Sequence, residues 1–398
     1  MKRVYLDNAA TTPMDPRVLE AMLPFLKESQ GNPSSFHGEG KDAKDAVDDA
    51  REKISKLIGA RPDEILFTSG GTEADNLAVL GYARANVVKG KHLVTTTFEH
   101  PAVLESMGHL ARKEGFELTL VSPNRDGLVS VDDVLAAIRP DTILVSVMLA
   151  NNEIGTIQPI AEIGNAIRKL RDEKKTVALF HTDACQATGS LAIDVEKFHV
   201  DMLTLNGGKI YGPKGVGVLY VKRGIKLQPL QFGGNQERGI RPGTENVAAI
   251  VGLAKAFELA QADRERENAR LLPLRDKLIS GLLERVKKSR LNGHPTQRLP
   301  NNVNMSFLDV EGEALLLYLD ASGIEASTGS ACTSLSLDPS HVILALGLPY
   351  EVAHGSLRFS LGHDTTDQDI DFVLETLPPL VEKLRAISPV RVDEKYYA

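Results

Sequence analysis

The chain has 398 residues, of which 42% are hydrophobic and 25% are charged, so it has enough apolar material for a large core and too little charge for a disordered polymer. Its 46 basic and 53 acidic residues give a net charge of −7, which excludes the basic surface of a general nucleic-acid-binding protein. With two cysteines, Cys185 and Cys332, one chain can build neither a disulfide framework nor a four-cysteine zinc site.

The first residues predict a short strand that leads into a polar turn. Residues 1–10 lack the charged and apolar regions of a secretory signal peptide. The chain also has no run of about 18 apolar residues, so we expect no membrane span. With so few cysteines, the reducing cytoplasm is the expected compartment. The length is typical of two domains.

Between residues 62 and 222, apolar β-branched segments alternate with helical periodicity, which predicts a parallel sheet covered by helices on both faces. The expected strands are 65–68, 92–97, 116–121, 142–149, 177–182, 202–205 and 215–221. The expected crossover helices include 74–88, 102–111 and 160–170. Polar residues follow several strand ends, which is where ligands bind in open α/β sheets.

The C-terminal part predicts a second, smaller unit. A long helix is expected from residue 247 to 286, with a break at Pro273. Strands at 302–307, 323–327 and 356–361 and helices at 311–322 and 367–387 indicate an α+β domain. We therefore expect a large domain of residues 15–260 and a small domain that combines 1–14 with 261–398. Residues 388–398 are expected to extend freely or to contact a partner.

The segment Ser69-Gly70-Gly71-Thr72-Glu73 follows an expected strand and opens a helix. Such a segment points backbone N–H groups and a hydroxyl at an anion, which indicates a phosphate site. It does not match the glycine motifs that bind nucleoside triphosphates or dinucleotides. An ordinary glycine-containing helix start is the alternative.

A carboxylate follows another expected strand, in His181-Thr182-Asp183-Ala184-Cys185-Gln186. Asp183 at that place would stabilise a protonated ring nitrogen of a cofactor. His181, Asp183 and Cys185 could also be considered as metal ligands, but they are crowded in the sequence and no second cluster would complete the coordination shell. We therefore expect no metal. Cys185, between small residues, is interpreted as a buried packing thiol.

The loop Asn206-Gly207-Gly208-Lys209-Ile210-Tyr211-Gly212-Pro213-Lys214-Gly215 comes directly after an apolar strand. A lysine held in such a glycine-flanked turn suits a Schiff base with a carbonyl cofactor, and Lys209 is the candidate. The alternative for Lys209 is a solvated surface lysine, which is how we interpret Lys214.

Two further residues, both in the C-terminal part, are candidates for a role in catalysis or substrate binding. Cys332 lies in Ser327-Thr328-Gly329-Ser330-Ala331-Cys332-Thr333-Ser334, a run too rich in small polar residues to form a core strand. A thiol on such a loop is either a liability or a nucleophile, and we favour the nucleophile. Arg358 interrupts a β-like run, where it would bind a substrate carboxylate with two hydrogen bonds or pair with an acid at a strand edge.

Together these segments resemble the cysteine desulfurases related to NifS and IscS, which belong to the fold-type I pyridoxal-phosphate superfamily. The likeness covers nearly the whole chain, and the run Ser330-Ala331-Cys332-Thr333-Ser334 is similar to the group I branch. Besides the lysine loop, the matching motifs are Tyr5-Leu6-Asp7-Asn8-Ala9-Ala10-Thr11-Thr12-Pro13, Asn32-Pro33-Ser34-Ser35 with His37, Phe67-Thr68-Ser69-Gly70-Gly71-Thr72-Glu73, Glu99-His100, Asn151-Asn152-Glu153-Ile154-Gly155-Thr156, Arg241-Pro242-Gly243-Thr244 and Gly329-Ser330-Ala331-Cys332.

The resemblance implies an α/β fold, with a mostly parallel central sheet in the large domain and a smaller α+β domain, and pyridoxal 5'-phosphate as the cofactor. Lys209 would carry the cofactor as a Schiff base, and Asp183 would pair with its ring nitrogen. Gln186 would bond the ring hydroxyl. His100 would stack on the ring and shuttle protons, and Asn152 would lie near the ring and the substrate.

The resemblance also implies a homodimer. Gly71 and Thr72 of one subunit would hold the phosphate together with Thr244 of the partner subunit. Arg358 and Asn32 would bind the substrate carboxylate, and Cys332 would be the catalytic nucleophile. The implied reaction converts L-cysteine to L-alanine and leaves the sulfur on Cys332 as a persulfide. The acceptor would be an Fe–S scaffold protein or another sulfur acceptor, as in tRNA or cofactor thiolation.

The chain departs from the family at the phosphate site. Asn206 and Gly208 stand where the family usually has serine and histidine. The amide of Asn206 still donates a hydrogen bond, but Gly208 removes a donor that could carry positive charge. We expect weaker phosphate binding, or a backbone N–H in place of the missing donor.

Two other functions stay open on the sequence. One is a selenocysteine lyase or another pyridoxal-phosphate enzyme acting on a small amino acid, with Cys332 incidental. The other is a non-catalytic scaffold that docks sulfur-assembly proteins, which the departures at Asn206 and Gly208 keep open.

Overall fold

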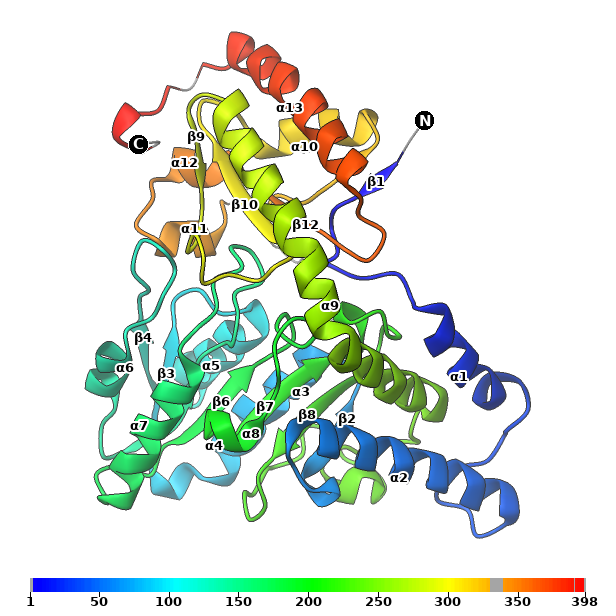
Figure 1. The fold of residues 1–398 in the computed structure, drawn as a ribbon. Helices are drawn as coiled ribbons and strands as arrows, with labels where there is room; N and C mark the ends of the chain where they lie inside the picture. Colours follow the sequence, from blue (N-terminus) through cyan, green and yellow to red (C-terminus); the bar gives the residue numbers. More distant parts are fainter. Residues whose placement is uncertain (1–2, 330–338, 390, 397–398) are drawn as a thin grey trace.

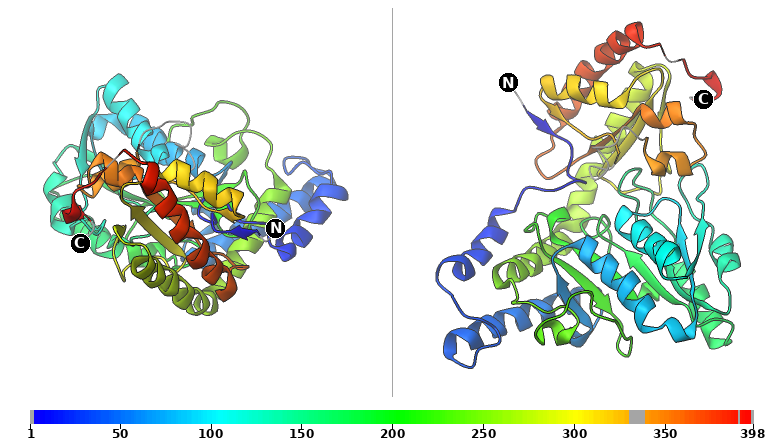
Figure 2. Two further views of the ribbon diagram at one scale, coloured as in Figure 1. Left: turned by 90° about the horizontal axis from the view of Figure 1, so that it is seen from above. Right: turned by 180° about the vertical axis from the view of Figure 1, so that it is seen from behind.

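The computed structural model describes residues 3–329, 339–389 and 391–396 (Figure 1). A larger part surrounds a seven-stranded sheet, and a smaller part lies at one end of it, with one long helix running from the first into the second. Figure 2 shows the same division from above and from behind.

The large sheet has the order β2-β8-β7-β6-β5-β3-β4. Strand β8 is antiparallel to both of its neighbours, and the other neighbouring pairs are parallel. The mostly parallel α/β sheet expected from the sequence is confirmed. Its strands are β2 (Ile65–Thr68), β3 (His92–Thr96), β4 (Glu117–Val121), β5 (Thr142–Ser146), β6 (Leu179–Asp183), β7 (Met202–Asn206) and β8 (Gly217–Val221).

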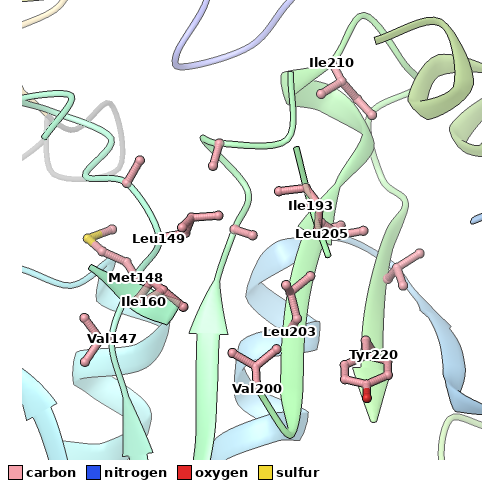
Figure 3. Packing of buried hydrophobic residues seen from close by; sticks show 14 of the residues in the cluster. Val147, Met148, Leu149, Ile160, Ile193, Val200, Leu203, Leu205, Ile210 and Tyr220 are labelled. Carbon is pink, nitrogen blue, oxygen red and sulfur yellow. The ribbon is translucent and has the colours of Figure 1, made fainter. Parts of the chain in front are cut away.

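Helices cover both faces of this sheet, because successive strand residues point to opposite sides and both sides are apolar. Ile65 and Phe67 of β2 join one hydrophobic cluster with helices α2, α7 and α9, whereas Leu66 joins another with α3 and α5. Figure 3 shows part of the first cluster, including Val147, Met148, Leu149, Ile160, Ile193, Val200, Leu203, Leu205, Ile210 and Tyr220. The helices of the large part are α1 (Pro16–Lys27), α2 (Gly38–Ile58), α3 (Gly71–Asn76), α4 (Tyr82–Ala85), α5 (Pro101–Lys113), α6 (Val131–Ala137), α7 (Ile160–Asp172) and α8 (Val195–Phe198).

The smaller part contains an antiparallel sheet of order β12-β10-β9 and a parallel pair formed by β1 and β11. The N-terminal strand therefore packs with the C-terminal part, as Figure 2 shows from behind. The elements are β1 (Val4–Tyr5), β9 (Ser289–Leu291), β10 (Asn302–Phe307), β11 (Ile324–Glu325), β12 (Ser356–Ser360), α10 (Gly312–Ala321), α11 (His341–Ala345), α12 (Tyr350–His354) and α13 (Asp367–Ile387).

Helix α9 (Val247–Arg285) connects the two parts and continues through Pro273, so the expected break there is wrong. Proline removes one helical hydrogen bond, which costs about 3 kcal/mol in an unsupported helix. Here Leu271 and Leu274, on either side of the proline, are buried in the core of the smaller part. This packing holds the helix together across Pro273.

The end of the chain also differs from expectation. The backbone N–H of Val392 donates to Asp309 Oδ1 at 2.7 Å, and Arg290 donates to the carbonyl of Tyr396 at 3.3 Å. These described tail residues therefore contact their own chain and do not extend freely. Among the described residues, no helix combines the length and the apolar character that crossing a membrane requires.

The boundary between the domains at residues 260 and 261 stays a prediction. Helices α11 and α12 belong to the C-terminal half, yet Val342 and Val352 in them join the cluster of the large sheet. The core of the smaller part includes Val4 and Leu6 from the N-terminus.

Candidate active site

A cavity of about 170 Å³ lies at the carboxyl ends of the parallel strands, where residues from distant segments meet. It is the place at which open α/β sheets bind ligands. Nine of the residues singled out in the sequence line it: Gly71, Thr72, His100, Asn152, Asp183, Gln186, Asn206, Lys209 and Arg358.

Lys209 is half-buried and lies in the turn that follows β7. The side chain of Asn206 accepts a hydrogen bond from Gly208 N at 3.0 Å, which fixes this turn. Lys209 Nζ donates to the carbonyls of Ala9 (3.0 Å) and Ala10 (2.5 Å). Gln186 donates to the same Ala9 carbonyl at 2.8 Å, so the N-terminal segment holds both side chains over the cavity.

Asp183 ends strand β6 at the bottom of the cavity and is 7% exposed. Its Oδ1 accepts a hydrogen bond from Cys185 N at 2.8 Å. Cys185 is buried, as expected, and burial together with the charge of Asp183 raises the pKa of its thiol. A thiol kept protonated in this way does not act as a nucleophile.

Two further carboxyl groups lie buried near Asp183. Burial, followed by the charge of Asp183, raises the pKa of Asp75 well above its ordinary value. Burial raises the pKa of Glu99 to about 8, despite hydrogen bonds from Met148 N and the Thr96 hydroxyl. With a pKa of about 8, Glu99 is mostly protonated at neutral pH, and the raised pKa of Asp75 acts in the same direction, so both shifts reduce the negative charge beside Asp183.

His181 lies 3.7 Å from Asp75, measured from Nε2 to Oδ1, and both side chains are buried. Burial lowers the pKa of His181 to about 4, so the imidazole is neutral and the contact is not an ion pair. Asp75 lines the cavity, and among the described residues its Oδ1 has no hydrogen-bond partner.

The sequence analysis missed Asp75, although a signal was present. Asp75 lies one helical turn after Gly71 and Thr72, and residues three or four apart in a helix share a face. A carboxyl group at that position must face the same cavity as the expected phosphate segment.

His100 and Asn152 reach the cavity from loops that follow β3 and β5. His100 caps helix α5, since its Nδ1 accepts from Ala102 N at 3.1 Å. The turn that carries Asn152 is fixed by Asn151, whose Oδ1 accepts from the backbone N–H groups of Glu153 (2.8 Å) and Ile154 (3.0 Å).

Arg358 enters the cavity from β12, an edge strand of the smaller sheet, and is 1% exposed. It donates to the carbonyl of Asn152 at 3.0 Å and to Asp7 Oδ1 at 2.8 Å, whereas its Nε has no partner among the described residues. Arg358 is therefore paired with an acid at a strand edge, which was one of the two interpretations from the sequence, and it also lines the cavity. The other interpretation, binding of a substrate carboxylate, stays a prediction.

Cys332 lies outside the described residues, and its role stays a prediction. The residues on either side of 330–338 both approach Glu153. The hydroxyl of Ser340 donates to Glu153 Oε2, and a Cβ built on Gly329 would lie 2.9 Å from the same oxygen. Because Glu153 follows Asn152, which lines the cavity, the described residues Gly329 and Ser340 both lie near the Asn152 loop.

A second, more open cavity of about 400 Å³ continues from the first. It is lined by Ala10, Thr11, Ser69, Gly70, Gly71, Thr72, Glu73, Asn206, Gly208, Lys209, Lys214 and Gly215. A Cβ on Gly71 would lie 2.8 Å from Cys185 Sγ and 3.5 Å from Asn206 Nδ2, so a larger residue at position 71 would clash with the Cys185 side chain.

The structure does not bring Asn32 or Thr244 to these cavities within one chain. Asn32 is exposed, and its side chain accepts from Ser34 N at 2.9 Å in a local turn. Thr244 is exposed as well. The expected roles of both residues stay predictions.

Comparison with known proteins bears on what this site does. The model of the family described as aminotransferase class-V matches residues 4–373. A cysteine desulfurase IscS of Methanosarcina thermophila is 54% identical over 99% of this chain and 95% of its own length, and one of Dictyoglomus turgidum is 52% identical over 99% of each. A solved NifS-like protein is 37% identical, with a TM-score of 0.89 over 96% of this chain and 100% of that one.

The chain belongs to the aminotransferase class-V family, among its cysteine desulfurases. The family resemblance drawn from the sequence motifs is therefore confirmed. Cysteine desulfurases depend on pyridoxal phosphate, so the cavity must accept an aldehyde, an aromatic ring with a nitrogen, and a phosphate.

The residues of the first cavity fit this cofactor of the cysteine desulfurases. Lys209 offers an amine for the aldehyde, and the carboxyl group of Asp183 lies buried at the bottom of the same cavity for a ring nitrogen. The imidazole of His100 and the amide of Gln186 line the space between them. The second cavity, which Gly71 and Thr72 line, has space for a phosphate group.

Proposed function

We propose that this chain releases L-alanine from L-cysteine and holds the sulfur atom as a persulfide on Cys332. The observation that carries the proposal is the meeting of three groups in one cavity: the amine of Lys209, the carboxyl of Asp183 and the guanidinium of Arg358. Arg358 is more than a hundred residues away from the other two in the sequence, and each group suits one part of the chemistry.

Bound pyridoxal phosphate supplies an aldehyde that captures an amine and a ring that withdraws electrons from the Cα atom attached to it. Lys209 would hold the aldehyde carbon. Asp183 would hold a protonated ring nitrogen, and Gln186 would bond the ring hydroxyl. The raised pKa values of Asp75 and Glu99 favour their uncharged forms, which limits further negative charge near Asp183.

Arg358 would bind the carboxylate of the substrate. Its guanidinium is fixed by the Asn152 carbonyl and Asp7, and it faces the cavity where Lys209 ends. A planar guanidinium held in this way binds a carboxylate with little loss of side-chain entropy. With the carboxylate at Arg358, the amine of Lys209 is the base we assign to the Cα proton, and His100 is the second group able to move a proton.

Cys332 would take up the sulfur as a thiolate. A bond forms between Cys332 Sγ and the sulfur of L-cysteine, while the Cβ–S bond of the substrate breaks. The products are L-alanine and a Cys332 persulfide, so atoms and electrons balance without an oxidant. The hydrogen bond from Ser340 to Glu153 and the closeness of Gly329 to the same carboxylate support this role, because both of these described residues lie near the loop of Asn152.

The test measures alanine and sulfide together, with purified holoenzyme, L-cysteine and dithiothreitol. We expect equal amounts of both products from the wild type. Lys209→Ala should abolish both, because no amine remains for the cofactor or for the Cα proton. Cys332→Ser should lose at least about 100-fold in sulfide release, because the nucleophile is absent.

Cys185→Ala is the matched control, since it removes a buried thiol and should leave sulfide release within about threefold. Wild-type sulfide release by Cys332→Ser would overturn the role of Cys332 and favour a different pyridoxal-phosphate reaction. A wild type that forms no alanine would overturn the proposed function and leave the scaffold interpretation.

We further propose that the enzyme is a homodimer and acts in the cytoplasm. Thr244 is exposed and outside both cavities of its own chain, which supports a role for Thr244 of the partner subunit at the phosphate. An enzyme that works through a thiolate needs a reducing compartment. The acceptor of the sulfur would be an Fe–S scaffold protein or another protein that accepts a persulfide sulfur.

A further inference from the structure

The second cavity lacks the side chain that the resemblance leads us to expect at position 208. A Cβ built on Gly208 would lie 3.6 Å from Lys214 Cγ and 3.6 Å from Asn206 Oδ1. The space next to Gly208 is therefore bounded by the stem of Lys214, from the same loop. The two residues lie side by side although six positions separate them.

The backbone of this loop is held firmly. Gly212 N donates to the Gly207 carbonyl at 3.1 Å, and Thr12 N donates to the Gly208 carbonyl at 3.0 Å. Thr12 also accepts from Tyr211 N at 2.8 Å through its hydroxyl. These bonds hold the part of the loop between the two residues, and a Cβ on Gly208 would also lie 3.8 Å from Lys214 Cα, so the two residues are close whatever the rotamer of Lys214.

The positively charged residues around this cavity differ in whether they already have partners. Arg241 lies nearby, but it pairs with Glu73 at 2.9 Å. Lys209 donates to two backbone carbonyls, and its amine is reserved for the aldehyde. Lys214 lines the cavity, is exposed, and has no hydrogen-bond or ion-pair partner among the described residues.

We propose that Lys214 is a phosphate-binding residue of this chain and supplies the positive charge that Gly208 cannot supply. The ligand class is a phosphate monoester dianion, and Gly71 and Thr72 line the same cavity as Lys214. The ammonium group of a lysine is a compact positive charge on a flexible side chain. It can therefore reach the phosphate through the space that is free next to Gly208. The proposal rests on the proposed function, because it concerns the phosphate of the same cofactor.

The experiment compares the binding of pyridoxal phosphate with that of pyridoxal, which lacks the phosphate. Absorbance titrations of the purified protein give a Kd for each compound, without any turnover. For Lys214→Gln we expect a Kd about 10-fold higher for pyridoxal phosphate and an unchanged Kd for pyridoxal. Lys214→Arg should keep most of the affinity, because the charge remains.

Lys222→Gln is the matched control, because Lys222 is an exposed lysine at the other end of strand β8. Its titrations should equal those of the wild type. Gly208→His combined with Lys214→Gln should regain affinity for pyridoxal phosphate, since an imidazole would occupy the same gap.

Unchanged binding of pyridoxal phosphate by Lys214→Gln would overturn the inference, and so would equal weakening of both compounds, which indicates a general change of the site. Neither result touches the proposed function. Failure of the wild type to bind pyridoxal phosphate would overturn the proposed function and, with it, the inference.

Discussion

The two ends of the active-site cavity are built differently. The ring end, which consists of Asp75, His100, Asp183 and Gln186, contains carboxyl groups that are at least nine-tenths buried. The phosphate end, which consists of Ser69 to Thr72, Asn206, Gly208 and Lys214, is open, and Ser69 and Lys214 in it are exposed. Both departures from the family pattern, Asn206 and Gly208, lie at the phosphate end.

This difference follows from the cost of changing a buried group. At the ring end, a substitution leaves an unpaired polar atom or a clash without access to water, which costs free energy directly. At the phosphate end, water and a neighbouring flexible side chain can replace a lost donor. The open end is therefore where a different set of residues can still hold the same ligand.

The largest effect is expected from Asp183→Asn at the ring end. The amide keeps an acceptor for Cys185 N, so the fold is retained, but the negative charge for the ring nitrogen is lost. We expect kcat for alanine formation to fall by about 10²- to 10³-fold at saturating pyridoxal phosphate. Ser69→Ala at the phosphate end removes one exposed hydroxyl and should change kcat by less than about threefold. Equal losses in the two variants would contradict the contrast between the ends.

Sequence reasoning located much of this site because the large sheet has a clear pattern. Its strands are apolar on both sides, and the residues that follow them, such as Asp183 and Lys209, fall at one edge of the sheet. The fold class followed from the same alternation. Strand β9 was missed because three residues carry too short a pattern.

Helix α2 was also missed, although His37 caps its first turn and Gly59 ends it in the left-handed region. Its charged sequence hides the narrow apolar face formed by residues such as Val47 and Ile54. The capping residues and the narrow apolar face, considered together, would have predicted this helix.

Other parts of the site depend on contacts between distant segments through groups that carry no sequence signal. Ala9 and Ala10 hold Lys209 by their backbone carbonyls, and any residue has such a carbonyl. Glu153 meets Ser340 across nearly two hundred residues. No local pattern predicts such meetings, because they are set by how the smaller part docks on the large sheet.

The buried acid Glu99 gives a second test of the ring end. In the unfolded chain its pKa is near the ordinary value of about 4.3, and in the folded protein it is about 8. Between these values the folded state keeps a proton that the unfolded state has lost. The contribution to stability is therefore complete below about pH 4 and is lost as the pH rises through 8, by up to about 1.4 kcal/mol per pH unit.

Glu99→Gln cannot ionise and should lack this contribution to the slope. Urea unfolding of wild type and variant from pH 5 to pH 8, at saturating pyridoxal phosphate, measures the difference in unfolding free energy. We expect the wild type to lose stability relative to the variant as the pH rises. A difference that is independent of pH would show that Glu99 keeps an ordinary pKa in the folded protein.

The smallest effects compare two glycines that line the second cavity, one beside a packed side chain and one beside free space. A Cβ on Gly71 would lie 2.8 Å from Cys185 Sγ, whereas a Cβ on Gly208 has no atom closer than 3.6 Å outside its immediate neighbours. Gly71→Ala should therefore lower the unfolding free energy in urea by about 1 to 3 kcal/mol. Gly208→Ala should raise it by up to about 1 kcal/mol, because alanine restricts the unfolded chain.

The clash at Gly71 has one identified partner, so it can be relieved. In the double variant Gly71→Ala with Cys185→Ala, at least half of the lost stability should return, since the sulfur atom is gone. If the two substitutions are instead additive, the contact with the Cys185 sulfur is not the cause of the stability lost in Gly71→Ala.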